Sequence, residues 1–170
     1  MTRTAQLSWL LPVALLTGCD VVERVHRPLH ENFEAVGLDG TEMTLESFRG
    51  KPWLVAVWMP GCGSCIKEFG DVQAVANAWA GPPVGFLALS VHADTAPVRR
   101  WAERIGLTIP VAILKQLTLE DLKLKTVPAT FFLDADANVV AIANGGRSRG
   151  FLERRLEELT RDGVTRTPER

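Results

Sequence analysis

The sequence predicts an α/β fold: one central sheet with helices packed on both of its faces. Two continuous apolar runs, at residues 53–58 and 84–91, have the pattern of strands that are buried on both faces. Segments with helical spacing of their apolar residues follow these runs, at 66–79 and 97–105. Because strands and helices alternate in this way, and no internal repeat is visible in the 170 residues, we expect a single domain.

A β-hairpin is expected before the first buried strand. Residues 32–38 alternate weakly between apolar and polar side chains, and residues 43–45 have the pattern of a returning strand. Asp39 and Gly40 lie between them and are typical of a hairpin turn. Residues 46–52 then predict a short helical turn that leads into the central strand.

The second half of the chain continues the pattern. The Gly-Pro-Pro sequence at 81–83 stops the first helix, and Asp94 is a candidate N-cap for the second helix. Residues 134–137 carry two aspartates between two apolar runs and therefore indicate a hairpin turn. The elements expected after the second helix are a short strand at 108–114, a short helix at 118–124, strands at 129–133 and 138–143, and an amphipathic helix at 148–161.

The first 18 residues have the architecture of an export signal. Arg3 and the free amine form a short positive region, and an apolar run follows at 7–16. This run is too short to span the hydrocarbon core of a membrane, which takes about 20 helical residues. Residues 16–19, Leu-Thr-Gly-Cys, also resemble the bacterial lipobox, in which the cysteine is acylated. We therefore predict a signal peptide at 1–18 and a lipid anchor on Cys19.

The rest of the chain divides into a tether, a domain and a tail. Residues 19–31 are mostly polar and are interpreted as the lipidated cysteine and a tether. The domain is expected at 32–161, and the polar residues 162–170 are predicted to form a flexible tail. In enterobacterial lipoproteins an aspartate after the acylated cysteine, as Asp20 is here, keeps the protein in the inner membrane. The predicted location is therefore the extracytoplasmic, periplasmic face of a bacterial inner membrane.

The chemistry of the chain is concentrated in Cys62 and Cys65, a Cys-x-x-Cys pair between the first buried strand and the helix after it. Two thiols with this spacing at a helix start can form a reversible disulfide, and the positive end of the helix favours the thiolate of the first. Half of a zinc site is the alternative interpretation. Zinc needs a second pair of ligands, and the sequence offers no second Cys-x-x-Cys, so redox chemistry is favoured.

Other classes of ligand have weaker support. The 19 basic and 20 acidic residues are mixed along the chain, so nothing indicates nucleic-acid binding. His26 and His30 would share one face of a helix and could hold a metal, but Pro28 between them disfavours a helix. We interpret both as solvated histidines of the tether. His92 follows the second buried strand and either approaches the dithiol or caps a loop.

Several of these residues resemble the thioredoxin superfamily. Trp58 stands four residues before Cys62, the cysteine pair opens a helix, and residues 126–133 read Thr-Val-Pro-Ala-Thr-Phe-Phe-Leu. The upstream segment 38–52, together with Glu68, is more similar to the TlpA/ResA branch. Members of that branch are membrane-tethered extracytoplasmic thiol-disulfide oxidoreductases, some of which serve cytochrome c maturation.

The resemblance covers residues 32–160 and implies a fold and a set of roles. The fold is thioredoxin-like: three α/β/α layers, a central mixed sheet, an N-terminal β-hairpin and an inserted segment before the strand that follows a cis-proline. Helix geometry allows Glu68 to lie near Cys65, because residues three apart share a face. The implied roles are attacking thiol for Cys62, resolving thiol for Cys65, acid for Glu68, cis-proline for Pro128, and substrate contacts for Trp58, Gly61, Val127 and Pro128.

The sequence also departs from the thioredoxin pattern. Thioredoxin has a buried aspartate six residues before its first cysteine, and Ala56 stands there in this chain. Proton handling would then fall to Glu68, to water or to the partner. Gly61 replaces the tryptophan that commonly precedes the nucleophile, so an aromatic platform for the partner is missing. The central residues Gly63 and Ser64 do not assign a redox direction.

The resemblance implies an enzyme that reduces disulfides in exported proteins, with apocytochrome c as one such substrate. Its partners would be protein disulfides or dithiols and a membrane electron donor, and no cofactor or metal is expected. An oxidase or isomerase would use the same two thiols in the opposite direction. A copper-binding chaperone would use Cys62, Cys65 and His92, and a structural lipoprotein would carry a vestigial disulfide.

Overall fold

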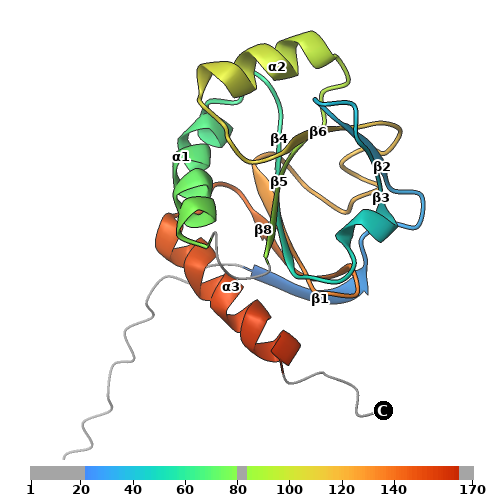
Figure 1. The fold of residues 1–170 in the computed structure, drawn as a ribbon, viewed down its shortest axis with the longest axis vertical. Helices are drawn as coiled ribbons and strands as arrows, with labels where there is room; N and C mark the ends of the chain where they lie inside the picture. The colour runs from blue at the N-terminus through green and yellow to red at the C-terminus, as the bar shows by residue number, and fades with distance from the viewer. Residues whose placement is uncertain (1–21, 80–83, 165–170) are drawn as a thin grey trace, which may run out of the picture.

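Eight strands form one mixed sheet in the order β1-β8-β7-β4-β5-β6-β2-β3 (Figure 1). The structure is a computed structural model that describes residues 22–79 and 84–164. The strands are β1 Val22–Pro28, β2 Glu34–Gly37, β3 Glu42–Thr44, β4 Trp53–Trp58, β5 Gly85–Ser90, β6 Val111–Leu114, β7 Ala129–Leu133 and β8 Asn138–Asn144. The helices are the 3-10 helix η1 Leu45–Phe48 and the α-helices α1 Gly63–Ala78, α2 Thr95–Arg104 and α3 Arg149–Val164. The expected thioredoxin-like sheet with flanking helices is confirmed.

The middle of the sheet explains where the dithiol lies. Strand β4 is parallel to β5 and antiparallel to β7, and every residue from Leu54 to Trp58 is buried. This is the environment that a continuous apolar run predicts. Because β4 and β7 are antiparallel, the end of β4 lies beside the start of β7, with Val57 opposite Ala129. The loop that carries the cysteines is thereby placed next to Val127 and Pro128.

The three α-helices contribute to the core on one face of the sheet. Buried residues of α1, α2 and α3 pack with Leu54 and Trp58 of β4 in one cluster. Strands β4, β5 and β6 follow one another across the sheet, so right-handed crossovers place α1 and α2 on the same side. The core on the opposite face contains Val55 and Val57 and is covered by η1 and the chain before β7, including Phe48 and Leu122. Figure 1 shows η1 across the sheet from α1 and α3.

The helix expected at 118–124 is wrong, because these residues form turns instead. The Asp121 carboxylate accepts hydrogen bonds from the backbone N–H of Thr118, at 2.8 Å, and from its hydroxyl. The Asp121 N–H donates in return to the Thr118 hydroxyl at 3.3 Å, so the pair has the reciprocal bonds of a helix N-terminus, but no helix continues from it. Lys123 has a φ of 58°, a left-handed conformation that ends a helix. The second face of the sheet is therefore covered by a 3-10 helix and turns, and the expected α-helix there is not formed within the described ranges.

The interpretation of residues 19–31 as a tether is wrong for Val22–Pro28, which form β1 and pair with β8 in antiparallel fashion. The register shifts between Arg24 and Arg27, so apolar and polar residues do not alternate as they would in a regular strand. The strand lies at the edge of the sheet, where backbone pairing suffices and few apolar side chains are needed. The domain therefore begins earlier than the predicted residue 32.

The two ends of the chain are described in part. The predicted signal peptide at 1–18 and Cys19 lie outside the described residues. Helix α3 continues to Val164, so the tail expected at 162–170 is wrong for its first three residues, and residues 165–170 are not described. No helix in the described part of the chain has both the length and the hydrophobicity needed to cross a membrane.

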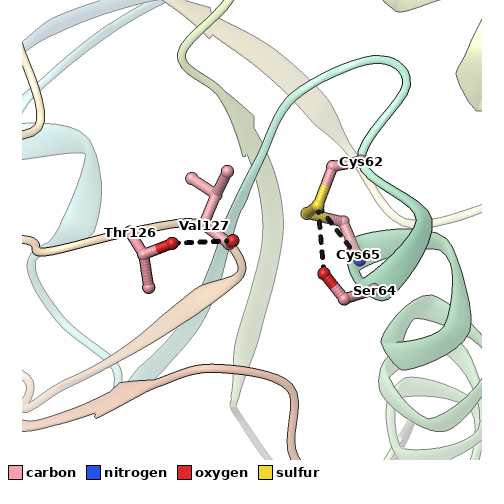
Figure 2. The surroundings of a disulfide bond; sticks show 5 residues. All are labelled: Cys62, Ser64, Cys65, Thr126 and Val127. Carbon is pink, nitrogen blue, oxygen red and sulfur yellow. Dashed lines mark hydrogen bonds between the residues drawn. A yellow bond between two sulfur atoms is a disulfide. The ribbon is translucent and has the colours of Figure 1, made fainter.

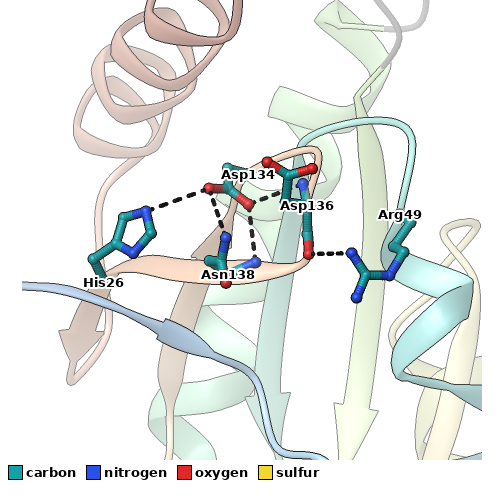
Figure 3. Close-up of polar contacts among 5 residues, drawn as sticks. All are labelled: His26, Arg49, Asp134, Asp136 and Asn138. Carbon is teal, nitrogen blue, oxygen red and sulfur yellow. Dashed lines mark hydrogen bonds and ion pairs between the residues drawn. The ribbon is translucent and has the colours of Figure 1, made fainter. Parts of the chain in front are cut away.

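Asp134 organises the turn between β7 and β8 (Figure 3). Its Oδ1 accepts hydrogen bonds from the backbone N–H groups of Asp136, at 3.0 Å, and Asn138, at 2.9 Å. Its Oδ2 accepts a bond from the Asn138 side chain and lies 4.0 Å from His26 Nε2 on β1. The Arg49 guanidinium donates to the backbone carbonyl of Asp136, at 3.1 Å. One carboxylate thus connects the hairpin to the edge strand.

Replacing Asp134 with alanine is expected to lower the free energy of unfolding by roughly 2 kcal/mol, because two half-buried donors of Asn138 and the exposed N–H of Asp136 lose their acceptor. Urea denaturation measures this change. Asp136→Ala is the matched control, because Asp136 takes part in the turn through its backbone and its side chain is exposed. Equal destabilisation by the two variants would contradict the role given to Asp134.

Candidate active site

A short loop brings Cys62 from the end of β4 to the start of α1. Gly61 has a φ of 80°, a conformation that glycine adopts without strain. The Cys62 N–H donates to the Met59 carbonyl, at 3.3 Å, which closes the turn. Cys62 is the N-cap of α1, and its sulfur accepts a hydrogen bond from the backbone N–H of Cys65 at 3.2 Å. The first thiol of the pair therefore sits at the positive end of the helix.

Cys62 and Cys65 form a disulfide with an S–S distance of 2.09 Å (Figure 2). The two cysteines differ in exposure: Cys62 is half-buried, whereas Cys65 is 1% exposed. Cys65 lies on the buried face of α1 with Glu68 and Phe69. An incoming molecule can therefore reach Cys62, and Cys65 is shielded behind it.

The peptide bond between Val127 and Pro128 is cis, as the resemblance implies. Pro128 is buried, and Figure 2 shows Val127 opposite the disulfide. The Val127 carbonyl accepts a hydrogen bond from the Thr126 hydroxyl at 3.1 Å. A carbonyl oxygen has two lone pairs, so that of Val127 keeps one for a further donor.

Gly146 lies at the point where the parts of the site meet. A Cβ atom on Gly146 would lie 3.8 Å from Pro128 Cγ, 3.9 Å from the Ser64 carbonyl and 4.0 Å from Glu68 Cβ. The N–H of the preceding Gly145 donates to the Pro128 carbonyl at 2.8 Å. Gly145 has a φ of 86°, which glycine adopts without strain, and it turns the chain after β8 toward the cis-proline. The sequence analysis did not place this turn at the site; the adjacent glycines at 145 and 146 are its signal in the sequence.

Glu68 is a buried acid on the same side of the site. Glu68 is 5% exposed. Its Oε1 accepts hydrogen bonds from the backbone N–H of Arg147, at 3.1 Å, and from the Thr130 hydroxyl, at 3.4 Å. Burial raises the pKa of Glu68 from 4.5 to about 7, and the hydrogen bonds from Arg147 and Thr130 oppose this shift. A cavity of about 290 Å³ adjoins Glu68 and is also lined by Lys67 and Asp71. Glu68 is thus poised to exchange a proton near neutral pH.

This pKa predicts a pH dependence of stability. The folded protein holds the Glu68 proton up to a pH of about 7, whereas the unfolded chain releases it near pH 4.5. The free energy of unfolding should therefore fall by roughly 3 kcal/mol through this group as the pH rises from 4.5 to above 7. Urea denaturation at several pH values should show that Glu68→Gln lacks this part of the slope. An identical slope in both proteins would show that Glu68 ionises as a solvated carboxyl does.

Trp58 and His92, two other residues considered for the site, make contacts within the protein. Trp58 is 1% exposed and packs edge-on against Phe69, with 5.3 Å between ring centroids, and its role as a substrate contact stays a prediction. Its apolar bulk lies in the core because strand alternation turns it toward α1. His92 Nδ1 accepts a hydrogen bond from the Asp94 N–H at 3.2 Å, the loop-capping alternative.

The copper hypothesis requires three ligands from Cys62, Cys65 and His92. Within residues 22–79 and 84–164, no three His, Cys, Asp or Glu side chains are grouped so that they could hold a metal ion. His26 and His30 do not share a helix face either, because His26 lies on the strand β1. The site is built from a disulfide, a buried acid and a cis-proline.

Comparison with known sequences places this site in a family. Residues 29–142 match the AhpC/TSA family. The thiol-disulfide oxidoreductase ResA of Geobacillus kaustophilus is 30% identical over 129 residues, which cover 75% of this chain and 74% of that protein. ResA of Geobacillus thermodenitrificans is 28% identical over 129 residues, with the same coverage.

Solved structures of disulfide oxidoreductases are similar to this chain in fold. DsbF of MTB, in its mixed oxidised and reduced forms, has a TM-score of 0.67 and 26% identity, covering 78% of this chain and 98% of that chain. A secreted Mycobacterium tuberculosis disulfide oxidoreductase homologous to E. coli DsbE has a TM-score of 0.65 and 24% identity, covering 75% and 96%. The second similarity supports the fold alone. With its disulfide at the start of α1 and its matches to ResA, the chain belongs to the AhpC/TSA family of thioredoxin-like proteins and is a thiol-disulfide oxidoreductase.

Proposed function

We propose that this protein reduces disulfides in exported proteins, with Cys62 as the attacking thiol and Cys65 as the resolving thiol. The observation that carries the assignment of roles is the difference in exposure: Cys62 is half-buried at the helix N-terminus, and Cys65 is buried on the same helix face as Glu68. The helix N-terminus favours a thiolate on Cys62, and a thiolate is the nucleophile in exchange. Cys65 can react only with a sulfur that is already joined to Cys62.

The reaction has two steps. The Cys62 thiolate attacks one sulfur of the substrate disulfide, a mixed disulfide forms, and the other substrate sulfur leaves as a thiolate. Cys65 then loses its proton and attacks the Cys62 sulfur, which restores the protein disulfide and releases the second substrate thiolate. Glu68 accepts the Cys65 proton in this step, because its pKa of about 7 suits proton transfer at neutral pH. Two electrons pass from the protein to the substrate.

The surroundings of Cys62 support a protein as the substrate. Gly61 and Gly63 flank the nucleophile, and a Cβ atom on either would meet nothing within 4 Å. Met59 is 39% exposed in the same loop and offers an apolar contact. The Val127 backbone lies opposite the disulfide, where it can pair with an extended segment of the substrate (Figure 2). Apocytochrome c is the specific substrate that the TlpA/ResA resemblance implies.

The export signal and the lipobox-like sequence ending at Cys19 support a location on the extracytoplasmic face of the inner membrane. A lipid on Cys19 would also account for the odd number of cysteines, since an acylated sulfur cannot enter a disulfide. In that compartment the oxidised Cys62–Cys65 pair needs a source of electrons. We propose a membrane-bound dithiol donor as the second partner.

Reduction of insulin tests the proposed direction. Protein that has been reduced and freed of excess reductant should transfer two thiol equivalents to insulin and become oxidised at Cys62 and Cys65, as mass spectrometry would show. A Cys62→Ser variant should transfer none. The proposed direction is wrong if the oxidised protein instead introduces disulfides into reduced ribonuclease A while the reduced protein leaves insulin intact.

A further inference from the structure

Two hydrogen-bond donors converge on the sulfur of Cys62 (Figure 2). The backbone N–H of Cys65 lies 3.2 Å from Cys62 Sγ, and the hydroxyl oxygen of Ser64 lies 3.4 Å from it. A disulfide sulfur carries no hydrogen, so the Ser64 hydroxyl must be the donor in this contact. At positions 59–64, the side chain of Ser64 alone contains a hydroxyl or N–H group, because the other residues are Met, Pro, Gly, Cys and Gly.

We propose that the Ser64 hydroxyl stabilises the Cys62 thiolate and is a catalytic residue of the exchange reaction. A disulfide sulfur is a weak acceptor, whereas a thiolate is charged and accepts a much stronger hydrogen bond. The contact in the oxidised protein therefore becomes stronger when the pair is reduced. This inference rests on the proposed role of Cys62 as the attacking thiol.

The same contact affects the redox equilibrium. Reduction of the pair takes up two electrons and one proton and yields a Cys62 thiolate and a Cys65 thiol. A dithiol donor supplies both electrons, becomes a disulfide, and releases its second proton to water. Because Ser64 contacts a sulfur whose charge appears only on reduction, it favours the reduced form and makes the pair a milder reductant. It also increases the fraction of Cys62 that is ionised at neutral pH.

Ser64 is well suited to substitution. It is exposed, and it lies in the first turn of α1, where alanine is compatible with the helix. Ser64→Ala removes the hydroxyl, and Ser64→Thr keeps one at the same position. Gly63→Ala is the matched control, because it adds a methyl group next to Cys62 in open space and changes no hydrogen bond to the sulfur. All three variants should fold.

The test is the pH dependence of iodoacetamide alkylation of the reduced full-length chain, with Cys62 identified by peptide mapping. Ser64→Ala should raise the pKa of Cys62 by about one unit, a tenfold loss of acidity, while Ser64→Thr and Gly63→Ala stay close to the parent. The equilibrium constant with glutathione should shift up to tenfold toward the disulfide in Ser64→Ala, which corresponds to about 30 mV.

The outcomes separate this inference from the proposed function. If Cys62 of the parent protein titrates near 8.5, as a free thiol does, its role as the activated nucleophile is wrong. If Cys62 is acidic but Ser64→Ala and Gly63→Ala behave alike, the roles of the cysteines stand and the function of Ser64 is overturned. The inference is supported if Ser64→Ala raises the pKa of Cys62 and Ser64→Thr keeps it near that of the parent.

Discussion

Replacement of Cys65 with serine is expected to stop turnover and to leave Cys62 covalently joined to substrate proteins. The accessible Cys62 can still attack a disulfide, but no second thiol is in place to displace the substrate. With pre-reduced protein and no added thiol, the rate at which reduced insulin is released should fall more than about a thousandfold. Non-reducing electrophoresis and mass spectrometry should show mixed disulfides that map to Cys62.

The control for this trap is Cys62→Ser. Cys65 is 1% exposed and cannot attack in its place, so this variant should lose activity without accumulating any adduct. Cys62→Ser with Cys65→Ser should behave in the same way. Adducts that form through Cys65, or a Cys65→Ser variant that stays reactive toward iodoacetamide at Cys62 but traps nothing, would contradict the two-step mechanism.

Glu68→Gln is expected to slow the resolving step by about a hundredfold. The amide side chain of this variant would keep an acceptor for the Arg147 N–H and the Thr130 hydroxyl, so the change removes the proton acceptor and leaves the local contacts in place. The measurement is the release of glutathione from a preformed mixed disulfide on Cys62, followed as a function of pH. In the parent protein this rate should rise as Glu68 loses its proton near pH 7 and then level off.

Asp71→Asn is the matched control for Glu68. Asp71 lines the same cavity and carries a carboxylate, but it is only half-buried and is not on the buried face with Cys65. Its replacement should leave the rate within a few fold of the parent. If the two variants lower the rate equally, or if the pH profile survives in Glu68→Gln, then water or the partner handles the Cys65 proton.

Much of the fold could be predicted because its central elements are encoded locally. The run at 53–58 is apolar throughout, and its strand β4 is buried in the middle of the sheet. Cys62 and Cys65 are three residues apart, so their disulfide and their place at a helix start follow from neighbouring residues. The position of Glu68 on the face of Cys65 follows from the period of the same helix.

Features that depend on distant partners could not be predicted. The edge strand β1 is polar and bulged, and its pairing with β8 specifies it. Glu68 is held by Thr130 and by the backbone of Arg147, which are 62 and 79 positions away in the chain. These contacts, and the close approach at Gly146, arise only when β7, β8 and α1 are assembled.

The equilibrium reduction potential of the Cys62–Cys65 pair, measured against glutathione buffers, tests the central claim most directly. A protein that reduces disulfides should have a potential of about −200 mV or lower, within the range of thioredoxin and glutaredoxins. A value near −120 mV, as in strong oxidants, would contradict the account and assign the same two thiols to disulfide formation.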